Sequence, residues 1–224
     1  MRQTTQTTDR EAGFSLMELI VAMCVMMIIT GAATSLLVGA FNVRSREDQR
    51  TEAIGDARRA LNILSRELAN SGYQLPRGLT YTSAAGASPV PMNGLIPSDC
   101  DDESITFVAN LNASLGTGDE DVNDDSEALK FQFFQNGDNN FLVRTDLRPG
   151  GDSIVLANRI DEVDFEYLND ANVPVAVTAA VRIRITMVVT LNPVGQPGTT
   201  SYHPPAQERL SSIVDLRNAT LGTY

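Results

Sequence analysis

The sequence predicts an α+β protein in which a long N-terminal helix carries a head of antiparallel β-strands. Three observations support this fold class. Residues 14–41 are almost continuously apolar, residues 42–70 are charged but carry an apolar stripe at helical spacing, and much of the remaining chain alternates apolar with polar side chains. An antiparallel sheet packed on the stripe would bury both apolar surfaces.

The first segment, residues 14–41, contains a single charged residue, Glu18, and no proline. A bilayer core requires about 20 helical residues, so this segment is long enough to span a membrane. Gly31 and Gly39 weaken the helix, and both a continuous helix and local melting around them fit the sequence. A cleaved secretory signal and a plain anchor both fit the hydropathy, although a charge inside the apolar run argues against the signal.

The second segment, residues 42–70, is rich in Arg, Glu and Ala and also lacks proline, which predicts that the helix continues to Asn70. Its apolar residues recur at spacings of three and four: Ile54, Ala57, Leu61, Leu64 and Leu68. This stripe fits a helix that packs on a sheet. A coiled-coil seam is the competing interpretation, but the stripe covers only about two heptads.

The remaining chain, residues 71–224, begins with helix-ending residues and a segment rich in Ser, Ala, Gly and Pro, residues 79–98, which we expect to be a loop. Alternating segments then predict strands at 105–107, 129–133, 141–145, 153–157, 163–167, 181–191 and 210–216. The second and third of these should form a hairpin around residues 136–140, NGDNN.

Charge and cysteine content restrict the function. The net charge of −11 disfavours direct binding of nucleic acid. Cys24 lies in the apolar helix and Cys100 lies in the head, so we expect no disulfide within one chain. A thiol in the head could pair between chains, but a buried, unpaired Cys100 is the favoured interpretation.

Catalysis is not expected. The single histidine, His203, lies in a Pro-rich segment with no acid, hydroxyl or thiol placed beside it as a partner, and Cys100 is flanked by acidic residues that should raise the pKa of its thiol. No nucleophile elbow, phosphate loop or zinc cluster is present in the sequence. We therefore predict that the protein is not an enzyme.

One acidic segment fits a cation site. Oxygen-bearing residues recur at every second position, a spacing that suits calcium: Asp119, Asp121, Asn123, Asp125 and Glu127. The segment departs from an EF-hand loop, because Asp124 replaces the expected glycine and Lys130 replaces the expected bidentate acid. A solvated loop without a cofactor is the favoured interpretation, and a calcium site is the alternative.

The residues before the apolar run give the most specific signal. The polar segment MRQTTQTTDREAG, which ends in Gly13, is followed by Phe14, Ser15, Leu16, Met17 and Glu18. This arrangement resembles the type III signal of type IV prepilins. The resemblance implies that residues 1–13 are a leader, that prepilin peptidase cleaves after Gly13, and that the same enzyme methylates the new N-terminus at Phe14.

The resemblance also suggests a role for Glu18. A carboxylate inside an apolar membrane segment is costly and marks a functional position. The methylated amine of Phe14 in a neighbouring subunit would be a cation able to pair with it, which relieves two desolvation costs together. Glu18 is therefore expected to act in subunit assembly. The alternative is a side chain that reaches from near the helix end to the lipid headgroups.

The segments RIDEVDFEYLNDANVPV, VRIRITMVV and ERLSSIVDLRN resemble PilW-type minor pilins and the related J-type minor pseudopilins of type II secretion. The resemblance implies a type IV pilin fold with a transmembrane and filament-core helix at 14–41, an amphipathic continuation at 42–70 and a head at 71–224. It also implies insertion in the inner membrane with a cytoplasmic N-terminus. The expected partners are prepilin peptidase, other minor pilins or pseudopilins and the major pilin.

Several functions fit this resemblance. A minor pilin in the priming or tip complex of a type IV pilus is favoured, and a minor pseudopilin of a type II secretion system is the nearest alternative. A membrane-tethered module that binds a ligand or adheres to a surface is a further alternative, supported by the acidic segment. A secreted enzyme would require cleavage near residue 33 and a catalytic cluster that the sequence lacks.

Overall fold

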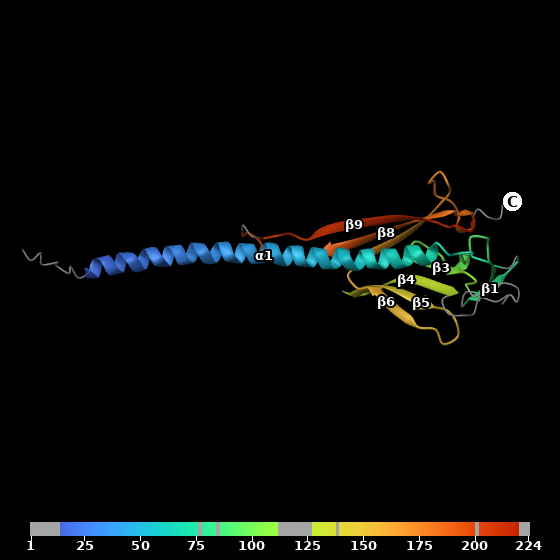
Figure 1. The fold of residues 1–224 in the computed structure, drawn as a ribbon, viewed down its shortest axis with the longest axis horizontal. Coiled ribbons are helices and arrows are strands. Elements are labelled where there is room, and N and C mark those ends of the chain that lie inside the picture. Colours follow the sequence, from blue (N-terminus) through green and yellow to red (C-terminus); the bar gives the residue numbers. More distant parts are fainter. Residues whose placement is uncertain are drawn as a thin grey trace, which may run out of the picture.

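The computed structural model describes residues 14–75, 78–83, 86–111, 127–137, 139–199 and 202–219. A single helix, α1, extends over Leu16–Leu68 and projects far beyond the head at its N-terminal end (Figure 1). The predicted long helix is confirmed, with each end two residues inside the expected range of 14–70. All the strands belong to the head, so the fold class is α+β as predicted.

The described residues of the head form three antiparallel sheets rather than the single sheet that the sequence predicted. The two-stranded sheet consists of β1 (Thr80–Ser83) and β2 (Gly86–Pro89). The four-stranded sheet has the order β3 (Ser104–Val108), β4 (Ala128–Asn136), β5 (Asn139–Asp146) and β6 (Ser153–Ala157). The three-stranded sheet has the order β7 (Glu162–Leu168), β8 (Arg182–Leu191) and β9 (Ala206–Asp215).

All seven strands predicted by alternation are present, and β4 and β5 form the predicted hairpin, with Asn136 paired to Asn139 across its turn. The expected loop at 79–98 is wrong over its first part, where β1 and β2 form a second hairpin. This hairpin has no alternating apolar pattern to reveal it in the sequence, because its residues are mostly Thr, Ser, Ala and Gly and only Tyr81 packs on the core.

The core forms where the sheets meet the second half of α1. The helix buries six residues at spacings of three and four: Ala53, Ala57, Ala60, Leu61, Leu64 and Leu68. Ile54 of the predicted stripe is only half-buried, and Ala53 takes its place. The small Ala53 and Ala57 pack against Val189 and Leu191 of β8, so the first turns of the stripe lie close to the sheet.

The two larger sheets lie on different sides of α1 (Figure 1). Both β8 and β9 of the three-stranded sheet contact the helix, and β6 of the four-stranded sheet contacts it as well. Their apolar faces share one core with the helix, which includes Leu64, Phe131 and Ile183. The helix lies between the two larger sheets. A single flat sheet could cover only one side of α1, so two separate sheets are needed to cover both.

Charged residues also connect α1 to both sheets. On the side of the three-stranded sheet, the Arg46 guanidinium donates to the Asn192 and Pro204 carbonyl oxygens, and Arg50 pairs with Glu208 at 2.9 Å. On the other side, the ion pairs Arg159–Glu52 and Arg144–Glu67 have N–O distances of 2.7 and 2.8 Å. The head is therefore held along α1 from Arg46 to its C-terminal end.

A close backbone approach fixes the C-terminal end of α1. Gly72 and Gly94 both have positive φ, and a Cβ atom on Gly94 would lie 2.1 Å from the Gly72 nitrogen. The same Gly72 nitrogen donates to the Val108 carbonyl of β3 at 2.9 Å. Only glycine fits at this contact, so α1 ends directly against the four-stranded sheet.

Candidate assembly site

The candidate site is the N-terminal end of α1, where Ser15 caps the helix. Its hydroxyl oxygen accepts a hydrogen bond from the Met17 backbone nitrogen at 3.3 Å. Glu18 is the third residue of the helix, so its carboxylate lies at the positive end of the helix dipole. Ser15 and Glu18 have the spacing of a capping box, a local signal that the sequence analysis did not use.

Phe14 directly precedes the Ser15 cap, and Glu18 follows in the first turn of the helix. Both side chains are exposed in the single chain, Phe14 to 86%. Within the described residues, Glu18 makes no ion pair. A cation that neutralises it in an apolar environment would come from outside the described part of the chain.

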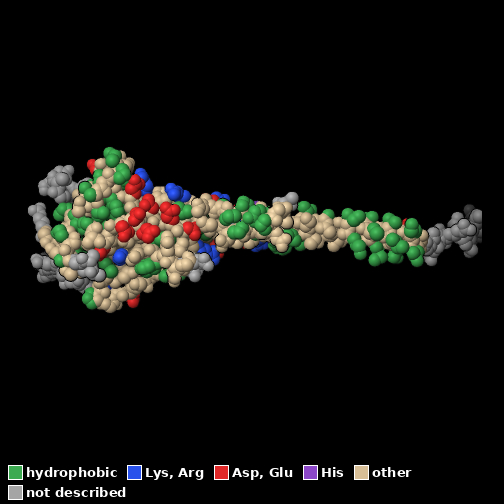
Figure 2. All heavy atoms as spheres, turned by 180° about the vertical axis from the view of Figure 1, so that it is seen from behind, with side chains coloured by type: hydrophobic (Ala, Val, Ile, Leu, Met, Phe, Trp, Pro, Cys, Tyr) green, Lys and Arg blue, Asp and Glu red, His purple; other side chains and the backbone are tan. Residues whose placement is uncertain are grey.

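The first half of α1 exposes apolar side chains on all sides, and these hydrophobic groups are visible along the stalk in Figure 2. Among the described residues, α1 is the one helix with the length and composition to cross a membrane, with a mean hydropathy of 2.2 over its most apolar stretch. None of that stretch is buried within the chain. An all-round apolar surface requires a partner outside the chain, which is either lipid or other helices.

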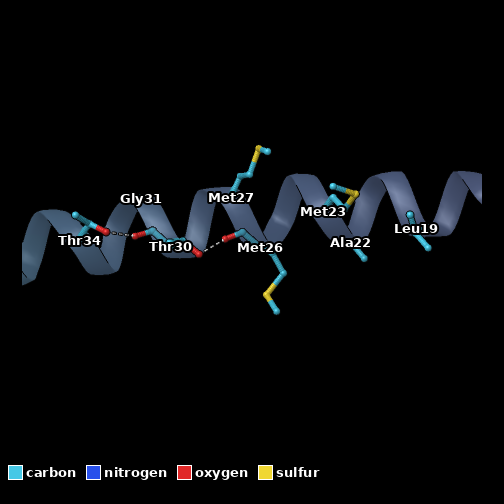
Figure 3. A pocket seen from close by; sticks show the side chains of 8 residues that line it. All are labelled: Leu19, Ala22, Met23, Met26, Met27, Thr30, Gly31 and Thr34. Atoms are coloured by element: carbon cyan, nitrogen blue, oxygen red, sulfur yellow. Dashed lines mark hydrogen bonds between the residues drawn. The ribbon is translucent and has the colours of Figure 1, made fainter.

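One side of this segment combines methionines with small residues (Figure 3). Its surface is lined by Leu19, Ala22, Met23, Met26, Met27, Thr30, Gly31 and Thr34. Small residues allow two helices to approach closely, and the flexible methionines fill irregular gaps between them. The surface therefore suits packing against another helix.

The threonines on this surface satisfy their hydroxyls within the helix. Thr30 Oγ1 donates to the Met26 carbonyl at 2.7 Å, and Thr34 Oγ1 donates to the Thr30 carbonyl at 2.8 Å, as drawn in Figure 3. Hydroxyls bonded in this way leave no unpaired polar group facing lipid. α1 remains continuous through Gly31 and Gly39 in the single chain.

With this geometry in place, the chain can be compared with known proteins. Residues 8–34 match the family described as the prokaryotic N-terminal methylation motif. The match includes Gly13, Phe14 and Glu18. The chain thus carries a prepilin-type N-terminus, and the predicted resemblance to type IV pilin-like proteins is confirmed in this region. The motif and the apolar helix together indicate membrane anchoring.

Comparisons over the whole chain add less. No curated protein matches this sequence. Among solved structures, a type IV-like pilin from Thermus thermophilus is similar with a TM-score of 0.41 and 12% sequence identity, over 75% of this chain and 98% of that chain. At these values, the similarity alone does not establish a shared fold.

The predicted cation ligands Asp119, Asp121, Asn123 and Asp125 lie outside the described residues. The fifth, Glu127, is buried at the start of the four-stranded sheet, where its Oε1 accepts from the Leu111 nitrogen at 2.9 Å. Within the described part of the chain, no three His, Cys, Asp or Glu side chains are arranged to hold a metal. Calcium binding stays a prediction.

The candidate reactive groups of the head lie in structural positions. Burial raises the pKa of the Cys100 thiol to about 11, and Asp99 makes a smaller contribution. The predicted increase of the pKa is confirmed, but its main cause is desolvation and not the neighbouring acids. The Cys100 thiol lies 3.3 Å from the Thr106 carbonyl, within hydrogen-bond distance. His203 pairs with Val194 through two backbone hydrogen bonds of 2.8 and 3.0 Å.

Acidic side chains gather on one face of the head (Figure 2). Asp164 on β7 lies near Glu162, Glu166 and Asp102, and partial burial followed by these charges raises the pKa of its carboxyl above the usual value. Glu166 is paired with Arg184 of β8. This face of the head is consequently acidic and hydrophilic, in contrast with the apolar stalk.

Proposed function

We propose that the protein is a minor pilin of a type IV pilus. In this proposal it is inserted in the inner membrane, cleaved after Gly13 and methylated at Phe14 by prepilin peptidase, and then enters the priming or tip complex with other minor pilins and the major pilin. The observation that carries the proposal is the methylation motif at residues 8–34, joined to a helix half without packing partners in its own chain. The role is one of assembly and not of catalysis.

The proposed mechanism depends on charge in an apolar environment. Cleavage would release an amine on Phe14, and this amine stays cationic when methylated. In a bundle of such helices, the amine of one subunit would pair with Glu18 of a neighbour. Either charge alone in low dielectric is expensive, so the pair selects the axial position at which both are neutralised.

The head would contribute recognition of neighbouring subunits outside the membrane. We propose that the chain starts with its leader in the cytoplasm and its head on the other side of the inner membrane. A minor pseudopilin of a type II secretion system would use the same cleavage site and the same Glu18 pairing. Reconstitution with minor pilins or with pseudopilins distinguishes these two, because only the cognate set should co-purify with the chain.

A calcium site in the acidic segment would support the alternative of a ligand-binding module. Its ligands would be those predicted above: Asp119, Asp121, Asn123, Asp125 and Glu127. Equilibrium dialysis with calcium tests it, with Asp121→Asn and Asp125→Asn as the variants expected to weaken binding. No retention of calcium by the unmodified chain would remove this support.

Intact mass and N-terminal sequencing of protein from native host membranes test the main proposal. We expect an N-terminus at Phe14 that carries one additional methyl group. A bulky residue in Gly13→Val should block cleavage, whereas Gly13→Ala should have a milder effect. An N-terminus at Met1 or near residue 33, or normal cleavage of Gly13→Val, would contradict the proposed processing.

A further inference from the structure

Within the described residues, each of the two larger sheets has one open edge. In the three-stranded sheet, β7 is covered because the Phe165 nitrogen donates to the Asp102 carbonyl at 2.9 Å. In the four-stranded sheet, β3 is covered because the Val108 nitrogen donates to the Gly94 carbonyl at 2.8 Å. The opposite edges of these sheets are β9 and β6. Open edges offer unpaired backbone groups to another chain.

The hydrogen-bond pattern shows which groups of β9 point outward. The Leu216 nitrogen donates to the Val181 carbonyl of the β8 side at 2.8 Å, so alternate residues from Val214 backward face β8. The residues between them direct their N–H and C=O groups to the open side: Gln207, Arg209, Ser211, Ile213 and Asp215. In the described part of the chain, nothing forms a backbone ladder with these groups.

The same reasoning applies to β6. The Asp146 nitrogen donates to the Asp152 carbonyl at 3.0 Å, so Asp152 faces β5, and Ser153 and Val155 direct their backbone groups outward. Ile154 and Val155 are 51% and 53% exposed. This edge therefore presents unpaired backbone together with uncovered apolar side chains.

The two open edges run in opposite directions relative to α1. β9 runs parallel to the helix, because Glu208 near its start pairs with Arg50 and Asn218 beyond its end bonds to the Ser71 carbonyl. β6 runs antiparallel to the helix. Its Ile154 is paired with Arg144, which contacts Glu67, whereas Arg159 beyond its end contacts Glu52.

We infer that β9 of one copy pairs with β6 of the next copy in the same filament. This inference rests on the proposed function, since subunits drawn from one membrane have parallel helices. An antiparallel ladder between two β9 edges would require antiparallel helices, whereas β9 and β6 form one with the helices parallel. The contact is heterologous, so a pair of copies leaves one β9 edge and one β6 edge open to other subunits of the complex.

Charge and shape support this pairing. A groove beside β9 is lined by Arg58, Leu61 and Asn62 of α1 and by Arg209 to Ser212 of the strand. Its cationic side chains, Arg58 and Arg209, suit a strand that carries an acid. Asp152, exposed immediately before β6, supplies that acid, and the half-buried Leu210 offers an apolar contact for Ile154 or Val155.

Cysteine cross-linking in host membranes tests the pairing. In a Cys24→Ala, Cys100→Ala background, Ser211→Cys and Val155→Cys are introduced singly and together, and a short bifunctional thiol reagent allows for differences in register. We expect cross-linked dimers and larger species when both cysteines are in one chain, and dimers alone when they are in two co-expressed chains. Each single variant alone should remain monomeric.

A backbone substitution provides an independent test. Ile213→Pro removes an outward N–H while leaving the β8–β9 ladder intact, and proline is tolerated at such positions. We expect the cross-linked fraction to fall about tenfold, as for a loss of one or two hydrogen bonds with their apolar contacts. Ile213→Thr retains the N–H and serves as the matched control, and thermal melting verifies that both heads stay folded.

The outcomes separate this inference from the proposed function. Cross-links with Ser211→Cys alone would indicate β9–β9 contacts and overturn the inference. Absence of cross-links in the double variant, with an N-terminus at Phe14, would overturn the inference and leave the proposed function standing. Absence of cross-links with an unprocessed N-terminus would overturn both.

Discussion

The two halves of α1 differ in composition and in surroundings. Leu36 in the first half is 77% exposed, whereas Leu64 in the second half is fully buried. Residues 16–41 are apolar on every side, while the second half confines its apolar residues to one stripe. An apolar stripe thus finds its partner within the chain, whereas an apolar surface on every side requires a partner outside it.

The two halves of α1 therefore have different roles. The second half of α1 is committed to its own head through the buried stripe and the four arginine contacts. The first half has no such commitment, so it is free to exchange lipid for other helices. The following changes test this division, starting with the largest expected effect.

Leu64→Ala should destabilise the head by about 2–5 kcal/mol, because it leaves a cavity in the core. Leu36→Ala is the matched change in the first half and should leave head stability unchanged. Since the chain has no tryptophan, unfolding by guanidinium chloride is best followed by circular dichroism of the full chain in detergent. Equal losses in the two variants would contradict the division of the helix.

Glu67→Gln should lower the free energy of unfolding by about 1–3 kcal/mol, a value between those for exposed and buried ion pairs. The reason is that the side chains of Glu67 and Arg144 are only 18% and 13% exposed. Asp48→Asn breaks the Arg44–Asp48 pair, whose side chains are at least 75% exposed, and should change stability by less than about 0.5 kcal/mol. The same unfolding experiment measures both. A loss in Asp48→Asn as large as that in Glu67→Gln would show that burial does not set the strength of these ion pairs.

Glu18→Ala should leave membrane insertion intact but lower incorporation into assemblies about tenfold, since the amine of a neighbour would lose its partner. Glu47→Ala removes an exposed carboxylate from the same helix and is the control. Pull-down with partner pilins and membrane fractionation measure the two properties. Unchanged incorporation of Glu18→Ala would refute its assembly role.

Asp164→Asn should stabilise the head slightly at neutral pH, by about 0.5 kcal/mol or less. The pKa of this carboxyl is raised in the folded state, so its ionisation costs stability above the usual carboxyl pKa. Below about pH 3 the carboxyl is protonated in both states, and the gain should disappear. Thermal melts at both pH values, with the exposed Asp170→Asn as control, measure this effect.

Much of the fold follows from local pattern. The alternation of Ile183, Ile185 and Met187 identified β8, because a strand with one buried face has a period of two. The β1–β2 hairpin escaped detection because Tyr81 is its only large apolar side chain that packs on the core, and one residue gives no alternating pattern. Ala53 and Ala60 were missed in the stripe, since alanine is equally common on exposed helix surfaces.

The N-terminal site could be predicted from the sequence more completely than the structure of the head. The prepilin-type N-terminus is a linear signal read along the chain, so Gly13, Phe14 and Glu18 are visible in the sequence. The division into separate sheets and the pairing of Arg144 with Glu67 depend on how distant segments meet around α1. A charged residue on a helix looks the same in the sequence whether it faces water or a sheet.

The direction of β8 and β9 along α1 has a mechanical consequence. When tension acts along the stalk, the attachment between helix and head is loaded in shear, so the buried stripe and the Arg46 and Arg50 contacts bear the load together. An attachment perpendicular to the stalk would instead peel open one contact at a time. The attachment of the head therefore resists tension along the axis of α1.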